Sequence, residues 1–121
     1  MKKQATLTQL EFARQGIVTD KMQQVSTTEK IDPEILRQRI AAGTAIICHN
    51  NRHSNGVPLA VGKGLRTKVN ANIGTSKDDT SIDKELEKAR VAVAAGADAI
   101  MDLSTGGPID EIRAAIINQT T

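Results

Sequence analysis

The stretch Lys68–Ser76, with the sequence KVNANIGTS, decides the fold because it reads as a β-strand with one polar face. Side chains alternate between the two faces of a strand. One face therefore carries Thr67, Val69, Ala71 and Ile73, and the other carries Lys68, Asn70 and Asn72. Asparagine is a poor strand residue because its side chain competes for backbone hydrogen bonds. Two asparagines on one face therefore need an explanation beyond strand propensity.

A helix and a second strand follow this stretch. Residues 81–95 place apolar side chains along one stripe, and Gly96 is the predicted stop signal. The stripe consists of Ile82, Leu86, Ala89 and Val93. Residues 98–103 read as the second strand, so the pattern predicts a βαβ unit with parallel strands and a right-handed crossover. After the segment STGGP, Asp110 is the expected N-cap of a last helix that buries Ile112 and Ile116.

The first half of the chain predicts three short helices. Thr8 and Glu11 match a capping box, and that helix should end at Gly16. Thr19 or Asp20 could cap the second helix, which carries Met22 and Val25. The third should begin at Asp32-Pro33, end at Gly43, and carry Ile35, Leu36 and Ile40 on one side.

A strand and a long connection complete this half. Residues 44–48, TAIIC, are predicted as a short buried strand. Residues 49–64 are rich in Asn, Gly and Pro and read as an irregular connection. The predicted domains are therefore a mostly helical segment, residues 1–64, with one strand and a long loop, and an α/β segment, residues 65–121.

The polar strand face favours one kind of α/β architecture. In an open doubly wound sheet this face would be buried under helices, at roughly 1–3 kcal/mol for each unpaired polar group. In a (β/α)8 barrel it points inward and meets the active site near the C-terminal mouth. We therefore expect residues 65–121 to form the first two βα units of such a barrel, with the remainder missing.

Two side chains are the main candidates for ligand contact. Asn72 stands near the C-terminal end of the first strand, and Met101 near that of the second. Asn70, on the same face as Asn72, and Ser104, just after the second strand, are weaker candidates. The alternative is that the asparagines satisfy backbone groups on an exposed edge strand and that Met101 fills a core.

Composition limits the other functions. The chain has 121 residues, 39% of them hydrophobic, a net charge of +2, and Phe12 as its only aromatic residue. A core without large aromatic side chains buries little apolar surface for an independent domain. We therefore expect this chain to be a piece of a larger protein. The charge predicts no nucleic-acid partner, and the Lys2-Lys3 pair reads as a solvated terminus. No apolar run reaches the roughly 20 residues of a membrane span and no signal peptide is apparent, so a cytoplasmic protein is expected.

Searches for other chemical motifs predict no metal site in this chain. Cys48 is the single cysteine, which excludes an internal disulfide and a cysteine-based metal site. His49 and His53 are four apart, but the surrounding asparagines argue against the helix that would hold them together. The segment GVPLAVGKG lacks the spacing of a P-loop.

Three separated blocks carry a family resemblance. ARQGIVTDKM (residues 13–22), GKGLRTKVNANIGTS (62–76) and GADAIMDLSTGG (96–107) together resemble the phosphomethylpyrimidine synthase (ThiC) family. The resemblance runs from about Thr8 to the end of the chain. It implies an N-terminal segment, a (β/α)8 barrel and a later Cys-x-x-Cys-x-x-x-x-Cys motif in a much longer, homodimeric protein.

The resemblance also implies an activity. A four-iron four-sulfur cluster cleaves S-adenosylmethionine to a 5′-deoxyadenosyl radical. The radical rearranges 5-aminoimidazole ribonucleotide into the hydroxymethylpyrimidine phosphate of thiamine, and a divalent metal such as zinc is bound as well. In this family the residues that match Asn72 and Met101 contact the ribonucleotide. The strand-face argument and the resemblance therefore select the same two residues.

Two departures from the family pattern leave alternatives open. The cluster cysteines, the metal-binding histidines and most phosphate contacts would lie beyond Thr121, so this chain alone is expected to be inactive and to bind substrate weakly or not at all. A non-catalytic truncated product that pairs with a full-length subunit is therefore one alternative. Residues 46–53 read IICHNNRH where many synthases have IPANINH. The second alternative is accordingly a 5-hydroxybenzimidazole synthase, which uses the same substrate to make the lower ligand of cobamides.

Overall fold

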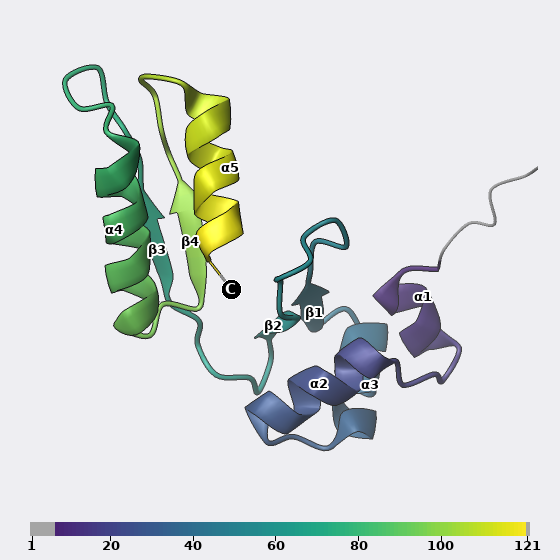
Figure 1. Ribbon diagram of the computed structural model, residues 1–121. Helices are drawn as coiled ribbons and strands as arrows, with labels where there is room; N and C mark the ends of the chain where they lie inside the picture. Colours follow the sequence, from purple (N-terminus) through teal and green to yellow (C-terminus); the bar gives the residue numbers. More distant parts are fainter. Residues whose placement is uncertain (1–6, 121) are drawn as a thin grey trace, which may run out of the picture. The chain divides into compact units, whose positions relative to one another are not determined.

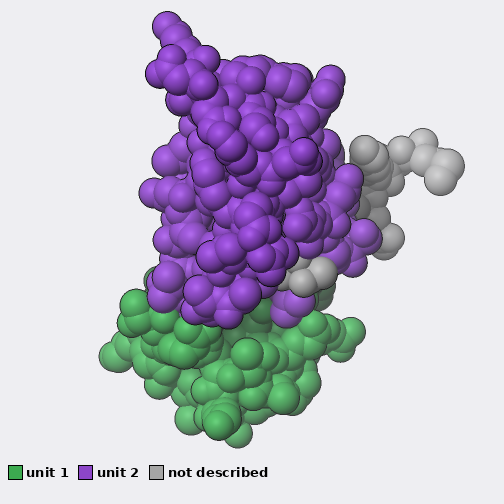
Figure 2. All heavy atoms as spheres, turned by 60° about the vertical axis from the view of Figure 1, so that its left-hand side comes forward, with its two compact units in different colours: residues 1–49, 58–67 green, residues 50–57, 68–121 purple. Residues whose placement is uncertain are grey.

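The computed structural model describes residues 7–120, so the Lys2-Lys3 pair lies outside the described part. The chain divides into two compact units, coloured separately in Figure 2. Unit 1 is Met1–His49 with Pro58–Thr67, and unit 2 is Asn50–Val57 with Lys68–Thr121. The domain boundary between residues 64 and 65 stays a prediction. No helix within residues 7–120 is long and apolar enough to cross a membrane.

The helices of unit 1 begin where their capping residues predict. These helices are α1 (Gln9–Arg14), α2 (Asp20–Glu29) and α3 (Pro33–Ala41). Thr8 and Glu11 form the capping box, in which the Glu11 carboxylate accepts the Thr8 backbone N–H at 2.7 Å. Thr19 caps α2, and Asp32 caps α3 ahead of Pro33. Local side-chain chemistry therefore accounts for the start of each helix.

Unit 1 also contains a strand that the sequence did not predict. β1 (Ala45–Cys48) pairs antiparallel with β2 (Leu59–Gly62), so the expectation of an irregular connection through residue 64 was wrong for its last part. A strand this short is stabilised by its cross-strand partner rather than by its own propensity. Ile35 is 44% exposed, which corrects its predicted place beside Leu36 and Ile40. The buried core of unit 1 consists of Ala13, Met22, Val25, Leu36, Ile40, Ala45 and Ala60.

Unit 2 is the predicted βαβ unit followed by a helix (Figure 1). Its elements are β3 (Asn70–Ile73), α4 (Ile82–Ala94), β4 (Ala99–Asp102) and α5 (Ile109–Gln119). The strands are parallel, which confirms the α/β class. One sheet face packs on the helices through Ile73, Ala89, Ile112 and Ile116. These aliphatic residues form the core of unit 2.

The start of α5 differs from the prediction. Pro108 occupies the N-cap position and makes no side-chain cap hydrogen bond. Asp110, predicted as the N-cap, lies inside the first turn of the helix. Proline is tolerated at this position because its missing N–H needs no intrahelical partner at a helix start. Ile112 and Ile116 are buried as predicted.

Candidate functional site

The open face of the β3–β4 pair carries three of the four predicted site residues. Asn70, Asn72 and Met101 are exposed, whereas Ile73 on the opposite face is buried. Asn72 and Met101 are direct partners in the parallel register. Met101 is 48% exposed and therefore does not fill the core of unit 2. The structure thus brings the two main candidates side by side on a surface with no covering layer among the described residues of unit 2.

Asn70, a weaker candidate, contacts Asn72 directly. Its Nδ2 atom donates a hydrogen bond to Oδ1 of Asn72 at 2.8 Å. The two side chains therefore form one polar unit on the strand. Amide groups can both donate and accept hydrogen bonds without carrying a charge, which suits contact with a neutral heterocycle.

Beyond the carboxyl ends of the strands, hydrogen bonds join the loop that follows β3 (residues 74–76) to the loop that follows β4 (residues 104–106). We call this loop pair the clamp. Thr105 donates its backbone N–H to the Thr75 carbonyl at 2.9 Å, and the Thr75 hydroxyl donates to the Gly106 carbonyl at 2.6 Å. A Cβ atom on Gly106 would lie 2.3 Å from the Ser76 carbonyl oxygen, so only glycine fits there. The clamp gives the carboxyl end of this strand pair a rigid border next to Asn72 and Met101.

Ser104, the other weaker candidate, lies inside this clamp. It is buried, and its hydroxyl donates to Oδ1 of Asp102 at 2.5 Å while it accepts the Thr75 N–H at 3.1 Å. The side chain is therefore directed into the loop pair rather than displayed on the open face. Its contacts in this chain are structural ones.

Asp102 ties the clamp to α5. Its carboxylate accepts hydrogen bonds from Ser104 and pairs with Arg113 Nε at 3.2 Å. Burial acts to raise the pKa of the Asp102 carboxyl, but the hydrogen bonds from Ser104 and Arg113 outweigh it and lower the pKa below its ordinary value. Asp102 therefore stays ionised at neutral pH as the common acceptor of these groups.

Glu85 is a site-supporting residue that the sequence reasoning missed. It is buried in α4, accepts the Gly74 N–H at 2.8 Å and pairs with Lys88 at 2.5 Å. The sequence did offer a signal for this role, because Glu85 lies on the same side of α4 as the apolar stripe. A carboxylate on the core side of a helix needs a partner, and here the exit of β3 supplies one.

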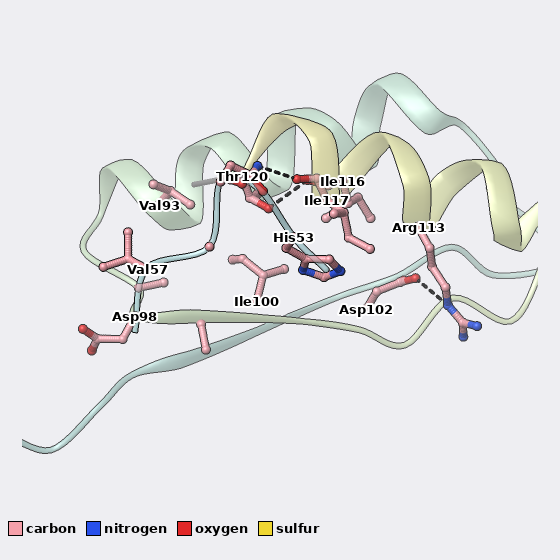
Figure 3. A pocket seen from close by; sticks show the side chains of 14 residues that line it. His53, Val57, Val93, Asp98, Ile100, Asp102, Arg113, Ile116, Ile117 and Thr120 are labelled. Carbon is pink, nitrogen blue, oxygen red and sulfur yellow. Dashed lines mark hydrogen bonds and ion pairs between the residues drawn. The ribbon is translucent and has the colours of Figure 1, made fainter. Parts of the chain in front are cut away.

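A pocket of about 410 Å³ lies elsewhere in unit 2, between β4, α5 and the segment Asn50–Val57 (Figure 3). His53, Val57 and Ile100 are among its lining residues, but Asn72 and Met101 are not. Asn55 holds this segment in place, because its Nδ2 donates to the carbonyls of Ile117 and Thr120, at 2.8 and 2.5 Å. His53 contacts Asn50 at 3.1 Å. Within residues 7–120 no group of three or more His, Cys, Asp or Glu side chains is placed to hold a metal ion.

The Ser104→Ala substitution tests the clamp. It would leave the buried Thr75 N–H without its acceptor, so we expect the free energy of unfolding of unit 2 to fall by about 1–3 kcal/mol. Ser76→Ala is the matched control, because the Ser76 hydroxyl only accepts an exposed N–H from Asp78. Urea denaturation of the two variants measures the difference. Equal stability would show that the Ser104 contacts do not stabilise the loops.

Known proteins that are similar to this chain carry the same enzyme name. The chain is 81% identical to "Phosphomethylpyrimidine synthase 2" of Syntrophotalea carbinolica over 94% of its own length. It is 74% identical to "Phosphomethylpyrimidine synthase" of Geobacter metallireducens over 93% of its length. It is 52% identical to the protein of that name from Pyrococcus furiosus over 92% of its length. In each case it covers 26% of the relative, so it spans about a quarter of the length of these proteins.

The family match covers all three sequence blocks and reaches into both structural units. The model of the radical SAM ThiC family matches residues 8–121, from the N-cap of α1 through the loop clamp and α5. The matched residues include Asn72, Met101 and the clamp that borders them. The chain belongs to the radical SAM ThiC family.

Proposed function

We propose that this chain contributes the first two βα units of a (β/α)8 barrel in a phosphomethylpyrimidine synthase. The complete enzyme would be a radical S-adenosylmethionine lyase that rearranges 5-aminoimidazole ribonucleotide to the pyrimidine phosphate of thiamine. Family membership and the relatives' names support the reaction class. The exposed polar face supports the barrel, because in a closed barrel this face would line the interior.

One observation carries the proposed site: Asn72 and Met101 are register partners on the open face, next to the clamped loops. The Asn72 amide would hydrogen-bond the edge of the imidazole ring. The Met101 thioether, which is polarisable and flexible, would pack against the ring face. The loop clamp would hold both strands at a constant spacing, so that the two contacts are made together.

The cofactors of the family are not matched by this chain's own residues. A four-iron four-sulfur cluster takes cysteine thiolates, and the chain has one cysteine, Cys48, which is exposed at the end of β1. The residues present do not fit such a cluster. We therefore propose that polypeptide outside this chain binds the cluster, S-adenosylmethionine and any divalent metal, and that this chain serves to bind and orient the substrate.

A chimaera tests the proposal. This chain replaces the matching 114 residues of the Syntrophotalea carbinolica synthase, which it resembles at 81% identity. The purified, cluster-loaded chimaera is assayed anaerobically with 5-aminoimidazole ribonucleotide and S-adenosylmethionine. Product analysis separates pyrimidine phosphate from 5-hydroxybenzimidazole. Absence of any turnover would contradict the proposed function. Formation of 5-hydroxybenzimidazole would show that the chain belongs to an enzyme that makes the alternative product.

Substitution of the site residues is expected to weaken substrate binding. We expect Asn72→Ala and Met101→Ala each to lower kcat/KM roughly 5- to 100-fold, since each removes about 1–3 kcal/mol of contact with the ring. Asn118→Ala is the matched control, because Asn118 is exposed on α5. If the site variants behave like this control, Asn72 and Met101 do not contact the substrate.

A further inference from the structure

The hydrogen bond between the two asparagines has a direction. Asn70 is the donor, through Nδ2, and Asn72 is the acceptor, through Oδ1, at 2.8 Å. Both side chains are exposed on the same face of β3. The Asn72 amide can turn over and keep a hydrogen bond to Asn70 only if the Asn70 amide turns over as well. The bond in this direction therefore holds the Asn72 amide in one of the two orientations that an exposed asparagine would otherwise adopt freely.

This orientation determines which atom Asn72 presents. Its carbonyl oxygen points back along the strand toward Asn70, so the planar amide places its NH₂ group on the opposite side. That side faces the carboxyl ends of the strands, where Gly74 and the loop clamp begin. The NH₂ group is purely a hydrogen-bond donor. Met101, the register partner of Asn72, has only a thioether sulfur and supplies no competing donor.

We propose that Asn70 is a positioning residue that holds the Asn72 NH₂ group toward the ligand, so that the ligand atom at this place is a hydrogen-bond acceptor. This inference rests on the proposed function and deepens it. Within the imidazole ring of an aminoimidazole ribonucleotide, the acceptor is the ring nitrogen that carries no hydrogen and no ribose. The exocyclic amino group is a donor and is directed away from Asn72.

Two substitutions at Asn70 separate the effect of the Asn72 amide orientation from the effect of side-chain volume at position 70. Asn70→Asp has the same shape but only acceptor atoms, so it attracts the Asn72 NH₂ group and turns the carbonyl oxygen toward the ligand. Asn70→Ala leaves the Asn72 amide free to adopt both orientations. In the chimaera we expect KM for the ribonucleotide to rise roughly 5- to 100-fold in Asn70→Asp and about 2- to 3-fold in Asn70→Ala. Because the aspartate also adds a charge, this ranking needs a second comparison.

A double-mutant cycle with Asn72→Ala provides that comparison. If Asn70 acts through Asn72, Asn70→Asp has less than about a 2-fold further effect once Asn72 is alanine. A direct effect of the new charge on the substrate would persist in that background. An equal loss from Asn70→Asp in both backgrounds overturns the inference.

The direction of the hydrogen bond is also measurable without substrate. Scalar coupling across the bond in the labelled chain should join the Asn70 side-chain nitrogen to the Asn72 carbonyl carbon. Coupling in the opposite sense overturns the inference, whatever the activity of the chimaera. If the unsubstituted chimaera shows no turnover, the proposed function and the ligand that it implies are contradicted. An active chimaera with no coupling between Asn70 and Asn72 leaves that function intact and overturns the inference alone.

Discussion

Replacing Gly74 by alanine is expected to lower the free energy of unfolding of unit 2 by about 2–6 kcal/mol, combining backbone strain with overpacking. Gly74 has a φ of +156°, and a Cβ there would lie 2.6 Å from the carbonyl carbon of Leu103 and 2.7 Å from the nitrogen of Ser104. These are backbone atoms, which cannot rotate away as a side chain could. The two loops would have to separate, with loss of the hydrogen bonds between Thr75 and Thr105.

Gly96→Ala is the matched control for this prediction. Gly96 also has a positive φ, +94°, but a Cβ there meets no atom within 4 Å. It therefore shares the conformational strain and lacks the clash. Urea denaturation followed by far-UV circular dichroism gives both stabilities, and hydrogen exchange of the Thr105 amide reports on the clamp itself. Equal losses in the two variants would show that the close approach at Gly74 is relieved without cost.

The second large effect is expected in the core of unit 2. Ile112 is fully buried in α5 and belongs to the cluster with Ile73, Ala89 and Ile116. Ile112→Ala should destabilise unit 2 by about 2–5 kcal/mol, because it removes buried methyl groups and leaves a cavity. The chain has no large aromatic side chain in this cluster to close over the gap.

Ile117→Ala, in the same helix, separates packing from helix propensity. Ile117 is 37% exposed, and the replacement gains the same intrinsic propensity as it does at position 112. We expect a change of less than about 1 kcal/mol for this control. The difference between the two variants in denaturation experiments measures the core contribution. Similar stabilities would place the core of unit 2 elsewhere than at Ile112.

Local patterns were sufficient for most helices and for the βαβ unit. Thr8, Thr19 and Asp32 satisfy backbone N–H groups within three residues, so their effect is visible in the sequence. β2 was missed because its partner, β1, lies across a long connection. The partner of Glu85 was missed for a similar reason, since Gly74 is 11 residues away in the chain. Interactions that depend on remote pairing leave little local trace.

The sequence by itself determined which residues share the polar strand face. Alternation along a strand is a property of the backbone, so Asn70 and Asn72 had to lie opposite Ile73 once the strand formed. The tertiary structure alone decided that Asn72 pairs with Met101 and that the Ser104 hydroxyl accepts the Thr75 N–H. The register of the parallel strands and the fit of their loops depend on the packing of α4, the helix that connects β3 to β4 in the sequence. That packing is a sum of contacts between distant residues, which no single stretch of the chain contains.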